Sequence, residues 1–452
     1  MPVISPARKA AFGILMAVER GSSHSDDLLH GKAVSALTPV DRNLVTALVL
    51  GVLRWQIWLD AKIRSFLQRP NAKLDPEALI ALRLGAFQLL FLDRIPAHAA
   101  ITESVELAKD SGHRFAARMV NAVLRRFARS DSLEPNLAGP AAVQAHPAWM
   151  VERWAKFYGG EAAQAICAHG QSQPALTLRI EDPQAEDELA RAGIELAPGE
   201  IVTAARTVVS GDAAASAALR EGRVRFQDEG SQLIAEIAAH TGENLNQKVK
   251  SIIDTCAAPG GKTLILAQRN PQAHIVACEA NPRRLAELRC RLAATAGRVE
   301  CRLADATALE EESAFDLALA DVPCSGTGTL GRNPEIRHRL RPEDLPRQAS
   351  RQRAILRAAL RAVRPGGRVV YSTCSLEPEE NEEVIAALLA ETHGMRQLSP
   401  ASLIDPMRSQ GILTDSGAER LRDCITPEGA LRLLPGSFRT DGFFLALLER
   451  RA

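Results

Sequence analysis

The feature that most constrains the fold is an alternation of short apolar runs with longer amphipathic segments after residue 250. Runs of this kind are typical of strands buried in a parallel sheet, and the segments between them have helical spacing. The predicted strands are 251–255, 274–278, 299–303, 315–320 and 367–372, and the predicted helices are 263–269, 282–296, 345–363 and 379–391. This order predicts an α/β domain whose helices cover both faces of a mostly parallel sheet.

Two further apolar runs, 431–434 and 442–448, are separated by the short loop 435–441. Their spacing predicts an antiparallel hairpin at one edge of the sheet. The prediction is therefore a sheet of seven strands. A ligand of such a sheet lies in the crevice at the carboxyl ends of its parallel strands.

The first 130 residues have apolar residues at helical spacing and no alternating strand. The predicted helical segments are 7–20, 44–66, 76–91 and 102–127, the last interrupted by Ser111-Gly112. These first 130 residues hold 18 Lys and Arg against 11 Asp and Glu, although the whole chain has a formal net charge of only +1. The near-zero net charge of the whole chain therefore conceals an excess of positive charge in the first 130 residues. Such a basic region suits a polyanionic partner.

Four arginines near the end of this helical front, Arg114, Arg118, Arg125 and Arg129, project within about 60° of one another at 100° per residue. Like charges this close repel unless anions neutralise them, and guanidinium groups suit phosphates. Two interpretations stay open. The arginines form either a phosphate-binding stripe or a solvated face whose acidic partners come from elsewhere in the chain.

A chain of 452 residues is long enough for about three domains. We predict a helical domain over 1–135, a mixed α/β linking subdomain over 136–240 and the α/β domain over 241–452. No uninterrupted apolar run reaches the roughly 18 residues of a membrane span. The eight cysteines lack the spacing of a disulfide framework or a zinc site. We therefore expect a cytoplasmic monomer with no membrane partner and no metal.

A glycine pair follows the first predicted strand, in the stretch DTCAAPGGKT over 254–263. Glycines at a strand-to-helix turn let the backbone approach a ligand, and the free N–H groups of the helix face that ligand. A P-loop is disfavoured because its first glycine is replaced by Cys256, and the dinucleotide fingerprint is disfavoured because 257–259 cannot supply its glycines. S-adenosylmethionine is the remaining common ligand.

Two acidic residues stand where that cofactor would need them. Glu279 closes the second strand, where a carboxylate accepts hydrogen bonds from ribose hydroxyls, and Asp305 closes the third, where it accepts from the adenine amino group. The alternative for each acid is a helix cap or a loop carboxylate.

Cysteines follow the next two strands, in Pro323-Cys324 and Thr373-Cys374. Carbon 5 of cytosine is not nucleophilic enough to accept a methyl group, but addition of a thiolate at carbon 6 converts the ring into an enamine that is. Asp321 stands near Cys324, where an acid would hydrogen-bond the pyrimidine and stabilise developing charge. Position alone favours Cys324 as the nucleophile and does not exclude Cys374. The other five cysteines outside the glycine-pair stretch are interpreted as small buried apolar residues.

The stretches DTCAAPGGKT, DVPCSGTGTLGRNPEIR and YSTCSLEPEENE resemble the motifs of the Sun-type family of RNA cytosine-C5 methyltransferases. The helical front is similar to the RNA-binding domain of the antitermination factor NusB. The combination resembles the bacterial Sun/Fmu-type enzymes that act on 16S ribosomal RNA, and the resemblance covers nearly the whole chain. It implies a multidomain protein, with an all-α NusB-like domain ahead of a Rossmann-like, S-adenosylmethionine-dependent methyltransferase domain.

The resemblance also implies roles for single residues. It makes Cys374 the nucleophile and gives Cys324 the task of assisting product release, which reverses the order that position favours. DNA cytosine methyltransferases use the cysteine of the Pro-Cys motif instead, so the presence of both cysteines indicates RNA. Relatives often carry Asp where this chain has Glu279. The implied cofactor contacts are Cys256, Ala257, Ala258, Pro259, Gly260, Gly261, Lys262, Glu279, Asp305 and Asp321.

Two alternatives to a 16S ribosomal RNA methyltransferase stay open at this point. Transfer RNA could be the substrate of the same cytosine-C5 chemistry. The chain could also be a non-catalytic NusB-like RNA-binding or assembly factor whose sheet domain is vestigial. The intact Cys324, Cys374 and Asp321 disfavour the second alternative.

Overall fold

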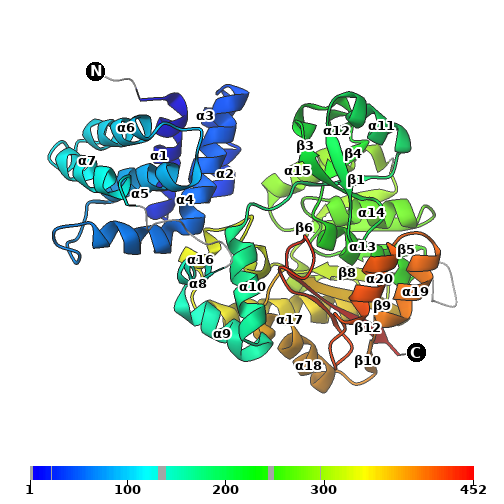
Figure 1. Ribbon diagram of the computed structural model, residues 1–452. Coiled ribbons are helices and arrows are strands. Elements are labelled where there is room, and N and C mark those ends of the chain that lie inside the picture. Colours follow the sequence, from blue (N-terminus) through cyan, green and yellow to red (C-terminus); the bar gives the residue numbers. More distant parts are fainter. Residues whose placement is uncertain (1–3, 22, 131–138, 243–248, 296, 452) are drawn as a thin grey trace. The chain divides into compact units, whose positions relative to one another are not determined.

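The computed structural model describes residues 4–21, 23–130, 139–242, 249–295 and 297–451. Contacts divide the chain into two compact units (Figure 1). The helical unit is Met1–Gln173 with Leu330–Arg339, and the sheet unit is Pro174–Thr329 with Leu340–Ala452. Whether 1–135, 136–240 and 241–452 fold as separate domains stays a prediction.

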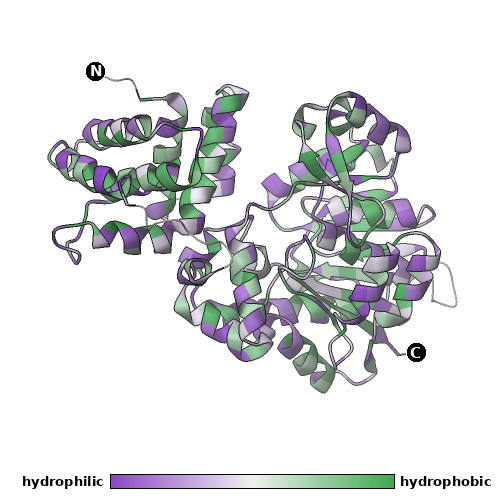
Figure 2. Cartoon of the chain, viewed as in Figure 1, coloured by the Kyte–Doolittle hydropathy of each residue, from purple (hydrophilic) through white to green (hydrophobic). Residues whose placement is uncertain are grey.

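The front of the chain is helical, as the apolar spacing predicts. The helices of the helical unit are α1 (Pro6–Glu19), α2 (Ser25–Leu29), α3 (Lys32–Ser35), α4 (Pro39–Ser65), α5 (Pro76–Phe91), α6 (Ala97–Asp110), α7 (Ala116–Phe127), α8 (Pro140–Gln144), α9 (Ala148–Tyr158), α10 (Gly160–Gln171) and α16 (Ile336–Arg339). Helix α5 packs against α1, α4, α6 and α7, and this position explains why it is apolar on nearly all sides. The two colours alternate along α7 in Figure 2, as expected of an amphipathic helix at the edge of the group.

Helix α4 is long and apolar enough to cross a bilayer by length and composition alone. Many of its apolar side chains, including Leu48, Val52 and Leu59, are fully buried in the core of the helical unit. The same residues that meet the membrane criterion therefore also serve as the core of a helical bundle.

A short segment that follows the Pro-Cys motif in the chain belongs to the helical unit. The guanidinium of Arg337 is 2% exposed and donates to the backbone carbonyls of Arg54, Ala145 and Gly170 at 2.9, 3.2 and 3.0 Å. Burial lowers the pKa of Arg337 to about 9. The periodicity of the sequence does not predict that this segment belongs to the helical unit, because its placement depends on carbonyl groups far away in the chain.

The sheet unit begins with a small antiparallel sheet in the order β2-β3-β1-β4. Its strands are β1 (Thr177–Ile180), β2 (Glu195–Pro198), β3 (Ala205–Ser210) and β4 (Val224–Phe226), and helices α11 (Pro183–Arg191) and α12 (Ala217–Arg220) accompany them. Leu178, Leu189 and Val224 share its apolar core. The mixed α and β content expected around this part of the chain is present.

The large sheet has the strand order β10-β12-β9-β8-β5-β6-β7, with β11 beside β12. Its strands are β5 (Ser251–Asp254), β6 (His274–Glu279), β7 (Val299–Leu303), β8 (Phe315–Asp321), β9 (Val363–Thr373), β10 (Met395–Leu398), β11 (Leu431–Leu433) and β12 (Phe443–Arg450). Strands β5 to β9 pair in parallel, and β12 runs antiparallel to β9 and β11, which confirms the mostly parallel sheet and its hairpin. Among the described residues the sheet has eight strands, one more than predicted, because β10 adds to the far side of β12.

Helices cover both faces of the large sheet, because its strands bury alternate residues on opposite sides. Ile252 packs in one apolar core with α13 and α14, and its neighbour Ile253 packs in another with α17 and α18. The helices of this unit are α13 (Glu229–Thr241), α14 (Gly261–Arg269), α15 (Pro282–Leu292), α17 (Asp344–Ala362), α18 (Glu382–Glu391), α19 (Ala401–Ser409) and α20 (Asp415–Arg422). The carboxyl ends of the parallel strands stay free of helices and line a pocket.

Candidate active site

A pocket of about 240 Å³ lies at the carboxyl ends of the parallel strands of the large sheet. Parallel strands end at the same edge, so residues far apart in sequence meet there. We call it the strand-end pocket. Its lining is Thr255, Cys256, Ala258, Glu279, Ala280, Arg284, Ala304, Asp305, Ala306, Asp321, Val322, Pro323, Cys324, Arg351, Ile355 and Cys374.

The two cysteines predicted to do chemistry meet in this pocket. Strands β8 and β9 are paired so that Asp321 lies opposite Ser372, and the loops that follow place the Sγ atoms of Cys324 and Cys374 3.3 Å apart. The hydrogen bond to Cys374 and burial raise the pKa of Cys324 well above its ordinary value. The two sulfurs are therefore close enough for the thiol of one cysteine to hydrogen-bond the sulfur of the other.

Asp321 lies at the end of β8 with both carboxylate oxygens engaged. Lys262 donates to one oxygen at 2.6 Å, and Ser372 donates to the other at 2.7 Å. Burial alone would lower the pKa of Lys262, but the nearby Asp321 carboxylate raises it. Each carboxylate oxygen has a second lone pair, so Asp321 can still accept a hydrogen bond from a ligand.

The glycine pair forms the turn between β5 and α14. Gly260 has φ +102°, in the left-handed region, and a Cβ there would lie 2.9 Å from Leu288. This explains glycine at the first position of the pair. Burial raises the pKa of Cys256 to about 12, and Cys256 lines the strand-end pocket.

The two predicted acids also line the pocket. One oxygen of Glu279 accepts from the backbone N–H of Asn281 at 2.8 Å, and the other lies 3.3 Å from Arg284. Asp305 accepts from the backbone N–H of Thr307 at 2.9 Å, and this bond lowers the pKa of Asp305. The cap interpretation is therefore true of Asp305, but the same carboxylate still faces the pocket.

The structure separates the predicted site residues into two groups. Lining the pocket are Cys256, Ala258, Glu279, Asp305, Asp321, Cys324 and Cys374. Five predicted residues of the glycine-pair stretch are not among the residues that line the pocket: Ala257, Pro259, Gly260, Gly261 and Lys262. Sequence reasoning missed Arg284, Arg351 and Ile355, which reach the pocket from helices that carry no motif.

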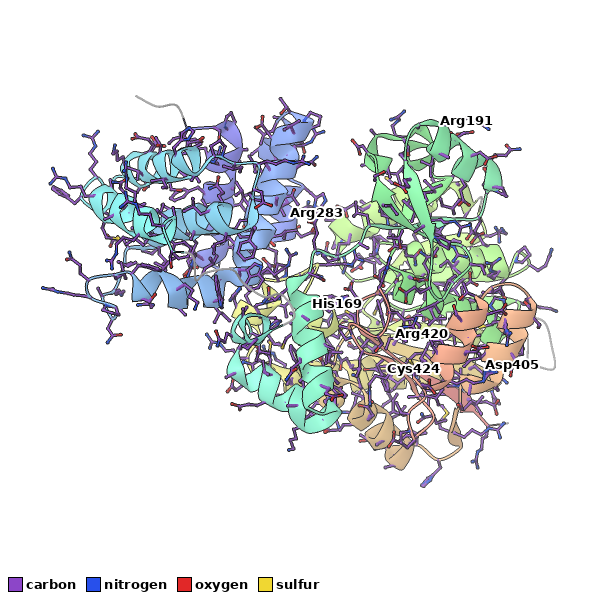
Figure 3. All side chains as sticks on the ribbon, in the orientation of Figure 1. His169, Arg191, Arg283, Asp405, Arg420 and Cys424 are labelled. Carbon is purple, nitrogen blue, oxygen red and sulfur yellow. The ribbon has the colours of Figure 1, made fainter. Side chains whose placement is uncertain are left out.

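The prediction that the remaining cysteines are buried is confirmed for two of the five. It is wrong for Cys290, which is exposed, and Cys301 and Cys424 are only half-buried. Cys167 and Cys278 are buried, and burial raises the pKa of each to about 12. Cys424 lies just past α20 near Arg420 (Figure 3), and its Sγ contacts the Arg420 carbonyl at 3.5 Å. All eight cysteines are free. Among the described residues, no group of three or more His, Cys, Asp and Glu has the arrangement of a metal site.

The arginine stripe is only partly helical, which corrects the projection made from the sequence. Helix α7 covers Ala116–Phe127, so Arg114 precedes it and Arg129 follows it. Helix α7 is 12 residues long and carries only Arg118 and Arg125 of the four arginines. All four arginines are exposed, and within the described parts of the chain none of them forms an ion pair with an acidic residue. Both interpretations of the four arginines therefore stay open.

Three family models match this chain in succession. The NusB family matches residues 5–129, a ferredoxin-like domain of the RsmF/B-like methyltransferases matches 146–209, and 16S rRNA methyltransferase RsmB/F matches 244–449. The probable ribosomal RNA small subunit methyltransferase B of Bacillus subtilis is 33% identical over 98% of both chains. The ribosomal RNA small subunit methyltransferase B of Pseudomonas putida is 34% identical over 87% of this chain and 91% of its own.

The chain belongs to the RsmB/F family of 16S rRNA methyltransferases. The fold agrees with that of PH0851, whose crystal structure matches 99% of both chains with a TM-score of 0.75 at 23% identity. Members of the RsmB/F family depend on S-adenosylmethionine. The strand-end pocket fits this cofactor, because it combines carboxylates that can accept hydrogen bonds, Glu279 and Asp305, with apolar Val322 and Ile355.

Proposed function

We propose that this RsmB/F family member methylates carbon 5 of a cytidine in 16S ribosomal RNA through a covalent bond between Cys374 and carbon 6. The observation that carries the proposal is the 3.3 Å separation of the Cys324 and Cys374 sulfurs at one end of the strand-end pocket. Two thiols this close, beside a carboxylate and a cofactor pocket, suit a reaction in which one adds to the base and the other handles a proton.

S-adenosylmethionine, when bound, supplies an electrophilic methyl group on its sulfonium. The thiolate of Cys374 forms a bond to carbon 6, and the electron pair of the ring double bond makes carbon 5 nucleophilic. The sulfur of Cys324 lies 3.3 Å from that of Cys374, and the order of roles proposed for the two cysteines is the one that the family resemblance implies.

Release of the product requires a base. After methylation, Cys324 gives its thiol proton to solvent, and the resulting thiolate takes the proton from carbon 5. The electron pair of that C–H bond restores the double bond between carbon 5 and carbon 6, and the Cys374 thiolate leaves. Once Cys374 is a thioether, it no longer places a thiolate charge 3.3 Å from Cys324, and this favours ionisation of Cys324. Cys324 can therefore change from acid to base within one turnover.

Asp321 is suited to hold the pyrimidine edge while charge develops on the ring. Its ion pair with Lys262 and its bond with Ser372 fix its orientation. A fixed carboxylate needs no reorganisation at the moment of reaction. Lys262 is thereby a positioning residue, and it acts through Asp321.

The helical front supplies the RNA contacts in this proposal. Arg114, Arg118, Arg125 and Arg129 are exposed and suit phosphate groups. The match to the NusB family covers all four. We infer a monomer that meets its ribosomal RNA substrate in the cytoplasm.

The decisive experiment uses one substitution at each cysteine. Cys374→Ala is expected to abolish methylation, because it removes the thiolate that adds to carbon 6 in this proposal. Cys324→Ala is expected to let the covalent RNA–protein complex accumulate on a denaturing gel, because the adduct forms but does not resolve. Full turnover by the Cys324→Ala protein with no adduct would contradict the assigned roles.

The substrate is tested separately from the chemistry. Bisulfite sequencing of total RNA from cells with and without the gene identifies the molecule that loses its 5-methylcytidine. Loss from 16S ribosomal RNA supports the proposal, whereas loss from a transfer RNA would keep the chemistry and change the substrate. Calorimetry that detects no S-adenosylmethionine binding would favour a non-catalytic RNA-binding factor.

A further inference from the structure

A buried carboxylate lies behind the two cysteine loops. Glu380 follows β9 and is 0% exposed. One of its oxygens accepts from the backbone N–H of Ser325 at 2.9 Å, and its other oxygen accepts from the hydroxyls of Ser325 and Ser375. These serines directly follow Cys324 and Cys374 in the chain.

A third element is attached to the same carboxylate. Gln352, on α17, donates to Glu380 at 2.9 Å and to the carbonyl of Pro323 at 3.0 Å. The two serine hydroxyls also lie 3.0 Å from each other. One side chain therefore connects both cysteine loops with the helix behind them.

The neighbouring residue fixes the second loop from both sides. Asn381 donates to the carbonyl of Ser375 at 2.9 Å and accepts from the hydroxyl of Thr373 at 2.6 Å. Cys374 lies between these two anchored residues. Its own carbonyl accepts from the backbone N–H of Gly328, in the Cys324 loop, at 2.9 Å.

The geometry points to Glu380 as a positioning residue that holds the Cys324 and Cys374 loops at the separation needed for methyl transfer. Within the described part of the chain, the hydrogen-bond partners of its carboxylate are neutral groups and no Lys or Arg is paired with it. A carboxylate buried in this way costs free energy that its hydrogen bonds offset only when all of them are made. Such a network tolerates few alternative arrangements of the two loops.

The inference rests on the proposed function, since it concerns the separation of two sulfurs that share one reaction. Glu380 lies behind the loops and is not among the residues that line the strand-end pocket. It acts through the serines and not on the RNA or the cofactor. Its loss should therefore change the rate of the chemical step and leave both binding steps in place.

The test compares Glu380→Gln with Glu383→Gln. The second variant makes the same replacement of a carboxylate by an amide at an exposed residue on α18. Glu380→Gln removes an acceptor for the serine hydroxyls without removing volume. We expect kcat to fall by about ten- to a hundredfold. The KM for RNA and the Kd for S-adenosylmethionine should stay within about twofold of wild type. Glu383→Gln should behave as wild type in all three measurements.

A readout without RNA separates this inference from the proposed function. Alkylation of Cys324 and Cys374 by iodoacetamide, followed by peptide mass spectrometry, reports the state of the pair in the free enzyme. We expect Glu380→Gln to change their rates by about threefold or more, with exposed Cys290 as the internal reference. If the wild type makes no 5-methylcytidine but the alkylation rates still change, the proposed function fails and the positioning role stands.

A second variant covers the case in which Glu380→Gln does not fold. The double variant Ser325→Ala/Ser375→Ala keeps the carboxylate and the backbone N–H donor but removes both hydroxyls. It should reproduce the lower kcat with unchanged KM and the altered alkylation rates. Wild-type kcat and wild-type alkylation rates in folded Glu380→Gln, or in the double variant, would overturn the inference.

Discussion

The helical unit and the two cysteine loops of the sheet unit are held together in different ways. The core of the helical unit consists of apolar side chains such as Leu82, Leu84 and Phe87, which pack between helices without directional bonds. The cysteine loops are fixed by buried polar groups, chiefly Glu380 and Asn381. Apolar packing tolerates small shifts at a cost spread over many contacts, whereas a hydrogen-bond network loses its geometry when one partner is removed.

This difference implies that substitutions in the two regions have different effects on stability and on the rate of the chemical step. Substitutions in the helical core should lower stability and leave the chemical step alone. Substitutions in the cysteine loops should lower the rate of that step more than they lower stability. Variants that violate either expectation would break the comparison.

Leu84→Ala should have the largest effect on stability. Leu84 is fully buried in α5, and a cavity at such a site costs about 2–5 kcal/mol. Thermal unfolding followed by circular dichroism should show a lower midpoint for the helical unit, while kcat measured below that transition stays at the wild-type value. Val40→Ala, at a side chain that is 78% exposed, should leave the midpoint unchanged.

Gly328→Ala should be the clearest defect in the cysteine loops. A Cβ at this position would lie 2.5 Å from the Gly442 carbonyl oxygen and 2.8 Å from that of Cys374. The loop that carries the nucleophile must therefore shift, and we expect kcat to fall by about a hundredfold in single-turnover assays. The control is Gly160→Ala, whose new Cβ meets no atom within 4 Å. A Gly328→Ala enzyme of wild-type rate would show that the loop geometry is not needed.

Charge reversal at Arg118 and Arg125 should affect neither core nor loops. Both arginines are exposed on α7, so Arg118→Glu/Arg125→Glu should weaken RNA binding by about tenfold at low salt. The slope of the logarithm of the binding constant against the logarithm of the salt concentration should fall by about one to two. Filter binding at several salt concentrations measures both. Arg191→Glu/Arg220→Glu makes the same change of charge on the exposed surface of the sheet unit. Equal losses in the two variants would mean that only net charge matters.

The smallest expected effect is a pH dependence near the cofactor turn. Burial raises the pKa of Asp254 from 3.8 to about 7, so the folded protein binds this proton more tightly than the unfolded chain does. Stability from this group is therefore present below about pH 4 and is lost as pH rises through about pH 7. Melting temperatures of Asp254→Asn and wild type should diverge over that range, to the advantage of the variant. Asp187→Asn, at an exposed residue, should follow wild type at every pH.

Much of the fold could be predicted because it depends on local periodicity. The prediction for 76–91 has the same bounds as α5, and the prediction for 299–303 has the same bounds as β7. The errors have local causes as well. Strand β10 was missed because its four residues carry little apolar pattern. The arginine projection failed because α7 begins after Arg114 and ends before Arg129.

The candidate site was predictable only where motifs mark it. Glu279, Asp305, Cys324 and Cys374 stand at strand ends that the sequence indicates, and all four line the strand-end pocket. Arg284 and Arg351 lie on amphipathic helices, where an arginine facing a pocket cannot be distinguished from one facing solvent. Glu380 lies at the start of the predicted helix 379–391, and the sequence pattern does not show that its side chain is buried.

The sequence by itself determined the fold class, the order of the elements, the basic front and the motifs that assign the chain to its family. The tertiary structure alone decided that Cys324 and Cys374 lie 3.3 Å apart, that Glu380 is buried between their loops and that Leu330–Arg339 joins the helical unit. The physical reason is the distance along the chain over which each kind of interaction acts. Periodicity and turn preferences act over a few residues, whereas these three features depend on the pairing of β8 with β9 and on polar partners that are distant in the chain.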